Sequence, residues 1–263
     1  MTKKETMKAI KEYWEKCTPM SFSPEGWNYE QKRKFRYELQ DYMHESFRFK
    51  DWAGKKVLEV GCGSGIDALE FARHGAIVTA ADITDNAVTL TRELASSAGL
   101  NVNVVQLSGF DLPFPDASFD CVYSYGVLHH IPEVEKTLSE ISRVLKNGGT
   151  VMSMLYNSDS LLYAYSIIYR HGIKGKLLLD GLSNEQDLVA RYSERIEGCP
   201  YTRAYTKEEA NQLFSKWFDN IEITVRYNVV DTDQQRKVKM ALDDKWELGW
   251  HLVVRARKKD SSH

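Results

Sequence analysis

The sequence predicts an α/β fold built on a parallel, doubly wound sheet. From Lys55 to Tyr156, short apolar runs alternate with segments of helical periodicity, and strands separated by single helices form a parallel sheet with right-handed crossovers. Residues 57–65 join one of these apolar runs to a loop with glycine at alternate positions. At 263 residues, the chain is long enough for one large domain or for a core domain with appendages.

Residues 1–50 are expected to form a helical cap outside the sheet. The segment 4–16 places Met7 and Ile10 at helical spacing, and the prolines at positions 19 and 24 end that helix. Residues 30–47 are expected to form a second helix with apolar side chains along one side.

Residues 51–156 are expected to form the core. Asp85 is the expected N-cap of the second core helix, and Gly75, Gly99 and Gly148 stand where helices should stop. The expected strands are residues 56–60, 77–81, 102–107, 121–125 and 150–155, and the expected helices are residues 66–74, 86–98 and 134–145.

After Tyr156 this alternation stops. Residues 157–205 are rich in tyrosine and leucine and are interpreted as a helical insertion. Regular structure returns in residues 206–263, with a helix at 207–217, strands at 221–230 and 250–256, and a polar, helical connection over 231–247.

The glycine loop and Asp82 indicate a nucleotide-type ligand. Glycines 61, 63 and 65 let the backbone turn sharply and let a ligand lie directly on it. A helix begins near Ile66, so its free N–H groups and positive dipole end face the same place. Asp82 follows at close to the roughly 20 residues that separate such a loop from a ribose-binding carboxylate. The alternative, a nicotinamide-dependent oxidoreductase, is disfavoured because Ile66 stands where its fingerprint has a third glycine.

The composition limits the partners. A formal net charge of −2 gives no reason to expect nucleic acid. The longest uncharged apolar stretch, 160–169, is too short for membrane insertion, and no signal peptide is recognised at the N-terminus. Together these observations favour a cytoplasmic monomer or homodimer. No metal and no disulfide are expected, because the cysteines are scattered without CxxC spacing, at Cys17, Cys62, Cys121 and Cys199.

Five sequence blocks in order carry a family resemblance. The first is the pattern E-x-G-x-G-x-G from Glu59 to Gly65. The others are ADIT at 81–84, LPFPDASFD at 112–120, YGVLHHI at 125–131 and ISRVLKNGG at 141–149. In this order they resemble the class I S-adenosylmethionine-dependent methyltransferases, and most closely their ubiquinone-type and small-molecule branch.

This resemblance implies a Rossmann-like, seven-stranded sheet whose last strand is antiparallel, with S-adenosylmethionine as cofactor. It assigns the methionine end to the glycine loop, the ribose hydroxyls to Asp82 and an apolar contact with adenine to Ile83. Glu59 is expected to fix loop N–H groups, or to reach the cofactor ammonium through water. The residues expected to bind the cofactor are Tyr13, Trp14, Glu59, Gly61, Cys62, Gly63, Gly65, Asp82, Ile83, Ser108, Gly109, Phe110, Tyr125, Gly126 and His130.

Some of these assignments have alternatives. Asp82 is otherwise a loop carboxylate or a helix cap. Tyr13 and Trp14, expected to cover the cofactor from the N-terminal helix, are otherwise core anchors. Ser108 departs from the family, which has an acidic residue there that accepts from the adenine amino group. Its hydroxyl, or the backbone of Gly109 and Phe110, would have to make that contact.

His129 and His130 are the candidate catalytic residues. They follow the fourth strand, and a neutral histidine is a suitable base if the methyl acceptor must lose a proton. The alternatives are that the pair caps the following helix or packs against the cofactor.

The insertion is expected to bind the methyl acceptor. Its aromatic and aliphatic character suggests an apolar or aromatic small molecule, methylated on oxygen or nitrogen. Alternatives are C-methylation of a quinone-like ring and a cofactor-binding partner or sensor without activity, and the insertion is otherwise a lid packed on itself or on a dimer mate. The candidate substrate residues are Tyr163, Ile167, His171, Tyr192, Tyr201, Arg203 and Tyr205.

Overall fold

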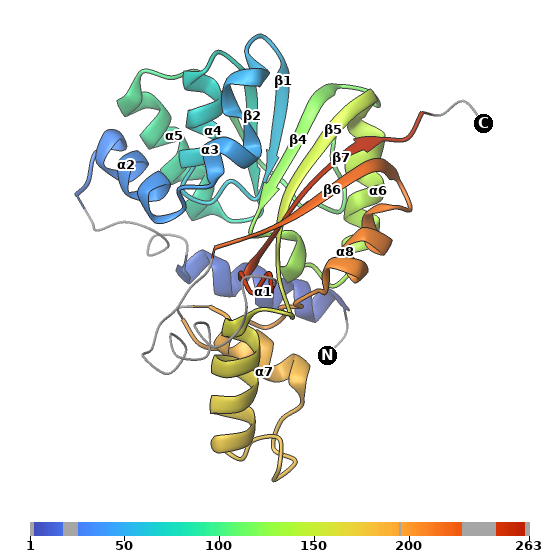
Figure 1. Ribbon diagram of the computed structural model, residues 1–263. Helices are drawn as coiled ribbons and strands as arrows, with labels where there is room; N and C mark the ends of the chain where they lie inside the picture. The colour runs from blue at the N-terminus through green and yellow to red at the C-terminus, as the bar shows by residue number, and fades with distance from the viewer. Residues whose placement is uncertain (1–2, 18–25, 195, 228–245, 261–263) are drawn as a thin grey trace.

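The computed structural model describes residues 3–17, 26–194, 196–227 and 246–260, which surround a seven-stranded sheet (Figure 1). The strand order is β3-β2-β1-β4-β5-β7-β6, and β7 alone runs antiparallel to its neighbours. The predicted Rossmann-like sheet with an antiparallel last strand is therefore confirmed. The strands are β1 (Lys56–Val60), β2 (Ile77–Asp82), β3 (Val102–Gln106), β4 (Phe119–Tyr125), β5 (Leu145–Tyr156), β6 (Phe218–Arg226) and β7 (His251–Lys258).

The two faces of the sheet bury separate apolar clusters, because successive side chains along a strand point to opposite sides. Val57 belongs to the cluster that also contains residues of α4 (Ile66–Arg73) and α5 (Asp85–Ala98). Its neighbour Leu58 belongs to the cluster that contains residues of α6 (Val134–Val144) and α8 (Lys207–Phe214). Helices therefore cover both faces, as a doubly wound sheet requires.

The helix α5 begins one residue earlier than predicted, and its N-cap is Thr84 rather than Asp85. Thr84 has extended backbone angles, and its side chain accepts a hydrogen bond from the Ala87 N–H at 3.3 Å. Asp85 already has a helical conformation, so its side chain is not placed to cap. At the other end, Gly99 takes the left-handed conformation and terminates the helix as predicted.

Gly148 does not stop a helix, which corrects the prediction. α6 ends at Val144 and β5 follows directly at Leu145. The pairing of β5 with β4 shifts register between the pairs Phe119–Leu145 and Cys121–Thr150. Gly148, with φ of 66°, lies in this irregular part of the strand, where its freedom at positive φ lets the chain make the detour.

The N-terminal cap contains α1 (Lys3–Cys17), α2 (Tyr29–Leu39), α3 (Met43–Phe47) and the 3₁₀ turn η2 (Phe49–Trp52). The single helix predicted over 30–47 is wrong, because Gln40 leaves the helical conformation with φ of −127° and ψ of 67°. This break turns Met43 and Phe47 into the core, where both are fully buried. The gain from that burial outweighs continuing the helix.

The insertion is helical, as predicted, and protrudes beyond the carboxyl ends of the parallel strands (Figure 1). It contains η4 (Leu162–Lys174), which has π-type hydrogen bonding, and α7 (Glu185–Tyr192). Ile167 and Leu188 from these helices share an apolar cluster with Trp250. The helix α1 lies at the same edge of the sheet, between the strands and the insertion (Figure 1).

The C-terminal part completes the sheet with small shifts from prediction. α8 ends at Phe214, earlier than the predicted Trp217, and β6 begins at Phe218 rather than at Ile221. Most of the connection predicted over 231–247 lies outside the described residues. Among the helices that are described, none is both long and apolar enough to cross a lipid bilayer.

Candidate functional site

The glycine loop follows β1 and is shaped by crowding on two sides. Gly61, Gly63 and Gly65 all have positive φ, at 79°, 52° and 80°. A Cβ on Gly61 would meet Val127 at 2.2 Å, and one on Gly65 would meet Thr91 at 2.6 Å. A Cβ on Gly63, in contrast, would meet nothing within 4 Å. The loop is therefore packed tightly at both ends and open at its centre, where a ligand can approach the backbone.

Asp82, at the end of β2, holds this loop. Its Oδ2 accepts a hydrogen bond from the Gly63 N–H at 3.0 Å, and its Oδ1 accepts from the N–H and hydroxyl of Thr84 at 2.9 and 2.8 Å. Burial raises the pKa of this carboxyl, and the backbone hydrogen bonds from Thr84 and Gly63 oppose the shift. A carboxylate has about four lone-pair sites, so three protein donors leave room for a ligand hydroxyl.

Glu59 lies on β1 below the loop, where it is 2% exposed. Burial, followed by the nearby Asp67 carboxylate, raises its pKa, while Arg36 acts in the opposite direction. Among the described residues, its Oε2 atom has no hydrogen-bond partner. A buried carboxylate oxygen without a donor is costly, so this atom indicates a polar group that approaches from the loop side.

A buried polar network under the loop ties the cap to the core, and sequence reasoning missed it. Asp67, in the first turn of α4, accepts hydrogen bonds from Arg36 Nη2 at 2.7 Å and from the Tyr123 hydroxyl at 2.9 Å. Tyr125, a predicted cofactor residue, donates its hydroxyl to Gln40 at 2.8 Å. That hydroxyl therefore points into the cap rather than to the open edge.

The loops that follow β3 and β4 lie at the same carboxyl-end edge of the sheet as the glycine loop. The Ser108 hydroxyl accepts a hydrogen bond from the Phe110 N–H at 3.4 Å. A Cβ on Gly109 would touch Val60 and Thr137 at 3.4 Å. Gly126 has φ of 74°, which turns the chain away from β4. The predicted residues of β1, β2, β3 and β4 thus meet at one edge, together with Cys62 and Ile83.

His129 and His130 lie in the 3₁₀ turn η3 (Leu128–His130), and both are buried. The interpretation that they cap the following helix is wrong, because the N-cap of α6 is Glu133. The ring of His129 stacks on Tyr156, with centroids 3.8 Å apart. Burial lowers the pKa of both histidines, and for His130 the Glu194 carboxylate opposes this shift.

Glu194 is a site residue that sequence reasoning did not identify. Its Oε1 lies 3.5 Å from His130 Nε2 and accepts a hydrogen bond from the Tyr156 hydroxyl at 2.7 Å. It follows α7 in the insertion, far along the chain from His130 and without any local motif. Only the folding of the insertion back onto the core brings these two groups together.

The other ring nitrogen of His130 is held by the insertion as well. His130 Nδ1 lies 3.1 Å from the Tyr201 carbonyl and 3.0 Å from the Thr202 hydroxyl. A carbonyl can only accept, so this contact requires the hydrogen on Nδ1 and leaves Nε2 with a free lone pair facing Glu194. The geometry therefore prepares Nε2 to take up a proton.

The helix α1 packs over this histidine. The rings of Trp14 and His130 lie 4.9 Å apart, and the Tyr13 hydroxyl donates to the backbone carbonyl of Ile196. Glu15 accepts hydrogen bonds from the N–H groups of Asp85 and Asn86 at 3.0 and 2.9 Å. Its carboxylate caps the start of α5 and anchors α1 beside the loop that follows Asp82.

The predicted substrate residues fall into two groups. Tyr201, Arg203 and Tyr205 adjoin the histidine pair, and the Arg203 N–H donates to the His129 carbonyl at 2.9 Å. Tyr163, Ile167, His171 and Tyr192 lie in the helical part of the insertion. There the His171 and Tyr192 rings stack 3.8 Å apart, which joins η4 to α7.

Comparisons with known proteins agree with this geometry. Residues 58–153 match the family described as "Methyltransferase domain". The chain is 31% identical over 128 residues to a ubiquinone biosynthesis O-methyltransferase of Coxiella burnetii, which covers 48% of this chain and 53% of that protein. It is 40% identical over 116 residues to a fatty-acid O-methyltransferase of Mycolicibacterium smegmatis. This match covers 43% of this chain and 41% of that protein.

A crystal structure from Thermotoga maritima, described as a SAM-dependent methyltransferase and possible histamine N-methyltransferase, has the same fold. Its TM-score is 0.57 at 19% identity, and the match covers 88% of this chain and 95% of that one. The chain spans about half the length of the curated relatives it matches. The region matched by the family contains the glycine loop, Asp82 and the histidine pair.

Proposed function

We propose that this chain, whose residues 58–153 match the family described as "Methyltransferase domain", uses S-adenosylmethionine to methylate an oxygen or nitrogen atom of a small, largely apolar molecule. The observation that carries the proposal is the His130–Glu194 pair. His130 follows β4, and the glycine loop follows β1, which lies beside β4 and parallel to it in the sheet. Methyl transfer to a nucleophile that carries a proton needs a bound cofactor and a proton acceptor close together. This edge of the sheet offers a candidate for each.

The residues of the edge fit S-adenosylmethionine. The open centre of the loop at Gly63 suits the methionine end, whose carboxylate and ammonium need backbone N–H and C=O groups. The unsatisfied Glu59 oxygen suits the ammonium, directly or through water. Asp82 is assigned to the ribose, with Ile83 and the segment Ser108–Phe110 beside the adenine. Cys62, Gly126, Tyr13 and Trp14 complete the assigned surroundings, and Tyr125 contributes its backbone and ring.

The cofactor, when bound, supplies an electrophilic methyl group, so the protein mainly has to align the acceptor. We assign the general base to His130, because Tyr201 fixes the hydrogen on Nδ1 and the buried Nε2 has no hydrogen-bond partner among the described residues. The resulting imidazolium is stabilised by Glu194 at 3.5 Å. His129, stacked on Tyr156, is assigned to shaping the pocket beside it.

The acceptor is placed between α1 and the insertion. The rings of Trp14 and Tyr156 contact the histidine pair there, and the segment that contains Tyr201, Arg203 and Tyr205 bonds to it through the Tyr201 carbonyl and the Arg203 N–H. These groups favour a molecule with an apolar body and one ionisable hydroxyl, carboxyl or amine. The names of the relatives, which refer to ubiquinone biosynthesis and to fatty acids, agree with that chemistry.

The first test is calorimetric titration of the purified chain with S-adenosylmethionine, S-adenosylhomocysteine and NADH. We expect binding of the two sulfur ligands and none of NADH. Candidate acceptors, namely hydroxyquinones, catechols, fatty acids and aromatic amines, are then screened by mass spectrometry for a gain of one methylene. Binding of NADH, or of neither sulfur ligand, would contradict the proposal.

A further inference from the structure

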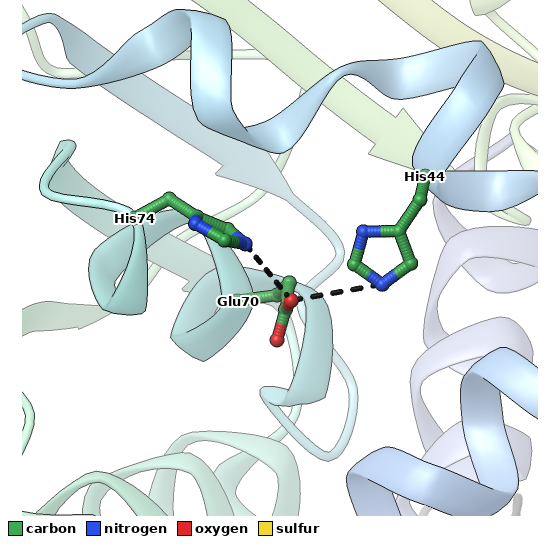
Figure 2. A group of neighbouring side chains, drawn as sticks. All are labelled: His44, Glu70 and His74. Carbon is green, nitrogen blue, oxygen red and sulfur yellow. Dashed lines mark hydrogen bonds and ion pairs between the residues drawn. The ribbon is translucent and has the colours of Figure 1, made fainter.

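His44, Glu70 and His74 form a compact group where the cap meets α4 (Figure 2). His44 belongs to α3 in the cap, Glu70 belongs to α4 in the core, and His74 directly follows α4. Glu70 and His74 are four residues apart, so they share one side of the helix. The three side chains point toward one another, and both histidines are directed at the same carboxylate oxygen (Figure 2).

The distances match those around a bound transition metal. Glu70 Oε1 lies 3.2 Å from His74 Nε2 and 3.6 Å from His44 Nε2. With Zn–N and Zn–O bonds of about 2.0 to 2.2 Å, a tetrahedral angle separates two ligand atoms on one zinc ion by about 3.3 to 3.5 Å. The ligand atoms of all three residues lie within 4.8 Å of one another, so a small rotation of the half-exposed histidines completes the set.

From this geometry we propose that His44, Glu70 and His74 bind a divalent transition metal of the Zn²⁺ type, which joins the cap to the core. Two imidazoles and one carboxylate are a ligand set that zinc takes, and they leave a fourth position open. The carboxylate is fully buried and both histidines reach the surface. The ion can therefore enter from solvent and still be held by a fixed ligand.

Arg33 is the competitor for this carboxylate. Its Nη2 donates to Glu70 Oε1 at 2.8 Å, and its Nε donates to Oε2. Metal binding at Oε1 displaces the first contact and retains the second, so the guanidinium stays beside the site. This nearby positive charge lowers the affinity for a cation, and we expect binding in the micromolar range rather than the tighter range of structural zinc sites.

His44 also lines a surface hollow of about 410 Å³. Arg33, Lys34, Tyr37 and His44 are among its lining residues. Two carboxylates, Glu30 and Glu38, balance the two cations of this lining, so we expect water rather than an anion in the fourth position. The hollow lies on the cap and is separate from the methyl-transfer site, so this proposal does not depend on the proposed function.

The test is calorimetric titration of the tag-free chain with Zn²⁺, together with thermal unfolding with and without the ion. We expect one Zn²⁺ bound per chain and a higher unfolding temperature, and no such effect of Mg²⁺, which prefers oxygen ligands. Co²⁺ gives a second readout, because its visible absorption reports tetrahedral coordination by nitrogen and oxygen.

The variants His74→Gln and His44→Gln each remove one ligand and leave the Arg33–Glu70 contact in place. We expect each to lower the Zn²⁺ affinity about tenfold or more, while Glu38→Gln, a charge change beside the same hollow, leaves it unchanged. Unfolding without metal shows that each variant is folded. Zn²⁺ binding of equal strength in both histidine variants would overturn the proposal and place the ion elsewhere, for example at His129, His130 and Glu194.

Discussion

At the scale of single residues, Asp82 has one observed task, and the proposed function gives it a second. It was expected to contact the ribose, with a loop carboxylate as the alternative. In the structure it braces the loop through Gly63 and Thr84. The two tasks are compatible, because a carboxylate has about four lone-pair sites and the three protein donors leave one for a ligand hydroxyl.

Asp82→Ala is expected to weaken S-adenosylmethionine binding by about tenfold to a hundredfold, because a hydrogen bond to a charged group contributes about 1.5 to 3 kcal/mol. Calorimetry measures this change. Asp85→Ala is the matched control, since Asp85 is exposed, begins α5 three residues after Asp82 and pairs with Lys11 at the surface, at 3.4 Å. Unchanged affinity in Asp82→Ala would remove the ribose assignment and leave the bracing role.

At the scale of elements, three pieces of the chain meet at His130. The turn η3 supplies the histidine, α1 supplies Trp14, and the insertion supplies Glu194 and the Tyr201 carbonyl. None of these pieces could hold the ring alone. The insertion therefore helps to hold the His130 ring in place, in addition to any contact it makes with an acceptor.

Glu194→Gln is expected to lower the turnover number by about tenfold or more, because general-base catalysis contributes typically 10²- to 10⁴-fold. Cofactor affinity should stay the same. Since Glu194 raises the pKa of His130, the variant should also move the acidic limb of the pH–rate profile to lower pH. His130→Gln is expected to lower turnover in the same way.

Glu197→Gln is the control for this pair of variants, because Glu197 is an exposed carboxylate in the same segment that pairs with Arg191 at 3.8 Å. A parallel loss of cofactor binding and turnover in His130→Gln would instead assign His130 to holding the cofactor.

At the scale of the whole molecule, three histidines are buried in or beside the sheet. Burial lowers the pKa of His129 and His130, and burial together with Arg36 lowers that of His251 to about 3. His251 Nδ1 lies 2.7 Å from the Tyr42 hydroxyl, which joins β7 to the cap. The fold is therefore held together with these rings in the neutral form.

The free energy of unfolding is expected to fall as the pH decreases from about 6.5, the ordinary histidine pKa, toward the lowered folded values. In that window the unfolded chain binds protons that the folded chain excludes, at up to about 1.4 kcal/mol per pH unit for each histidine. Urea unfolding at a series of pH values measures the slope. In His251→Gln the slope of unfolding free energy against pH should be smaller by the contribution of close to one proton, about 1.4 kcal/mol per pH unit. A slope identical to that of the unchanged chain would show that the fold does not exclude a proton from His251.

The sequence by itself determined the sheet and the cofactor edge, because both rest on local signals. Apolar runs and turn glycines act within a few residues, and the spacing of Asp82 from the loop is set by one helix and one strand, so Gly61–Gly65 and Asp82 were predicted as a unit. The N-cap of α5 could not be predicted in the same way. Thr84 and Asp85 are both residue types that cap helices, and the extended backbone angles of Thr84 decide between them.

Only the tertiary structure decided which distant side chains meet. The break at Gln40, the pairing of Glu194 with His130 and the group His44, Glu70 and His74 all join segments far apart in the chain. These contacts are stabilised by the burial of apolar side chains and by hydrogen bonds and ion pairs to charged groups. Both depend on the final packing and not on any repeating pattern in the sequence. For that reason the sequence indicated a cofactor, a reaction class and the histidine pair as candidate catalytic residues, while Glu194 as the partner of His130 and the cap-to-core group required the fold.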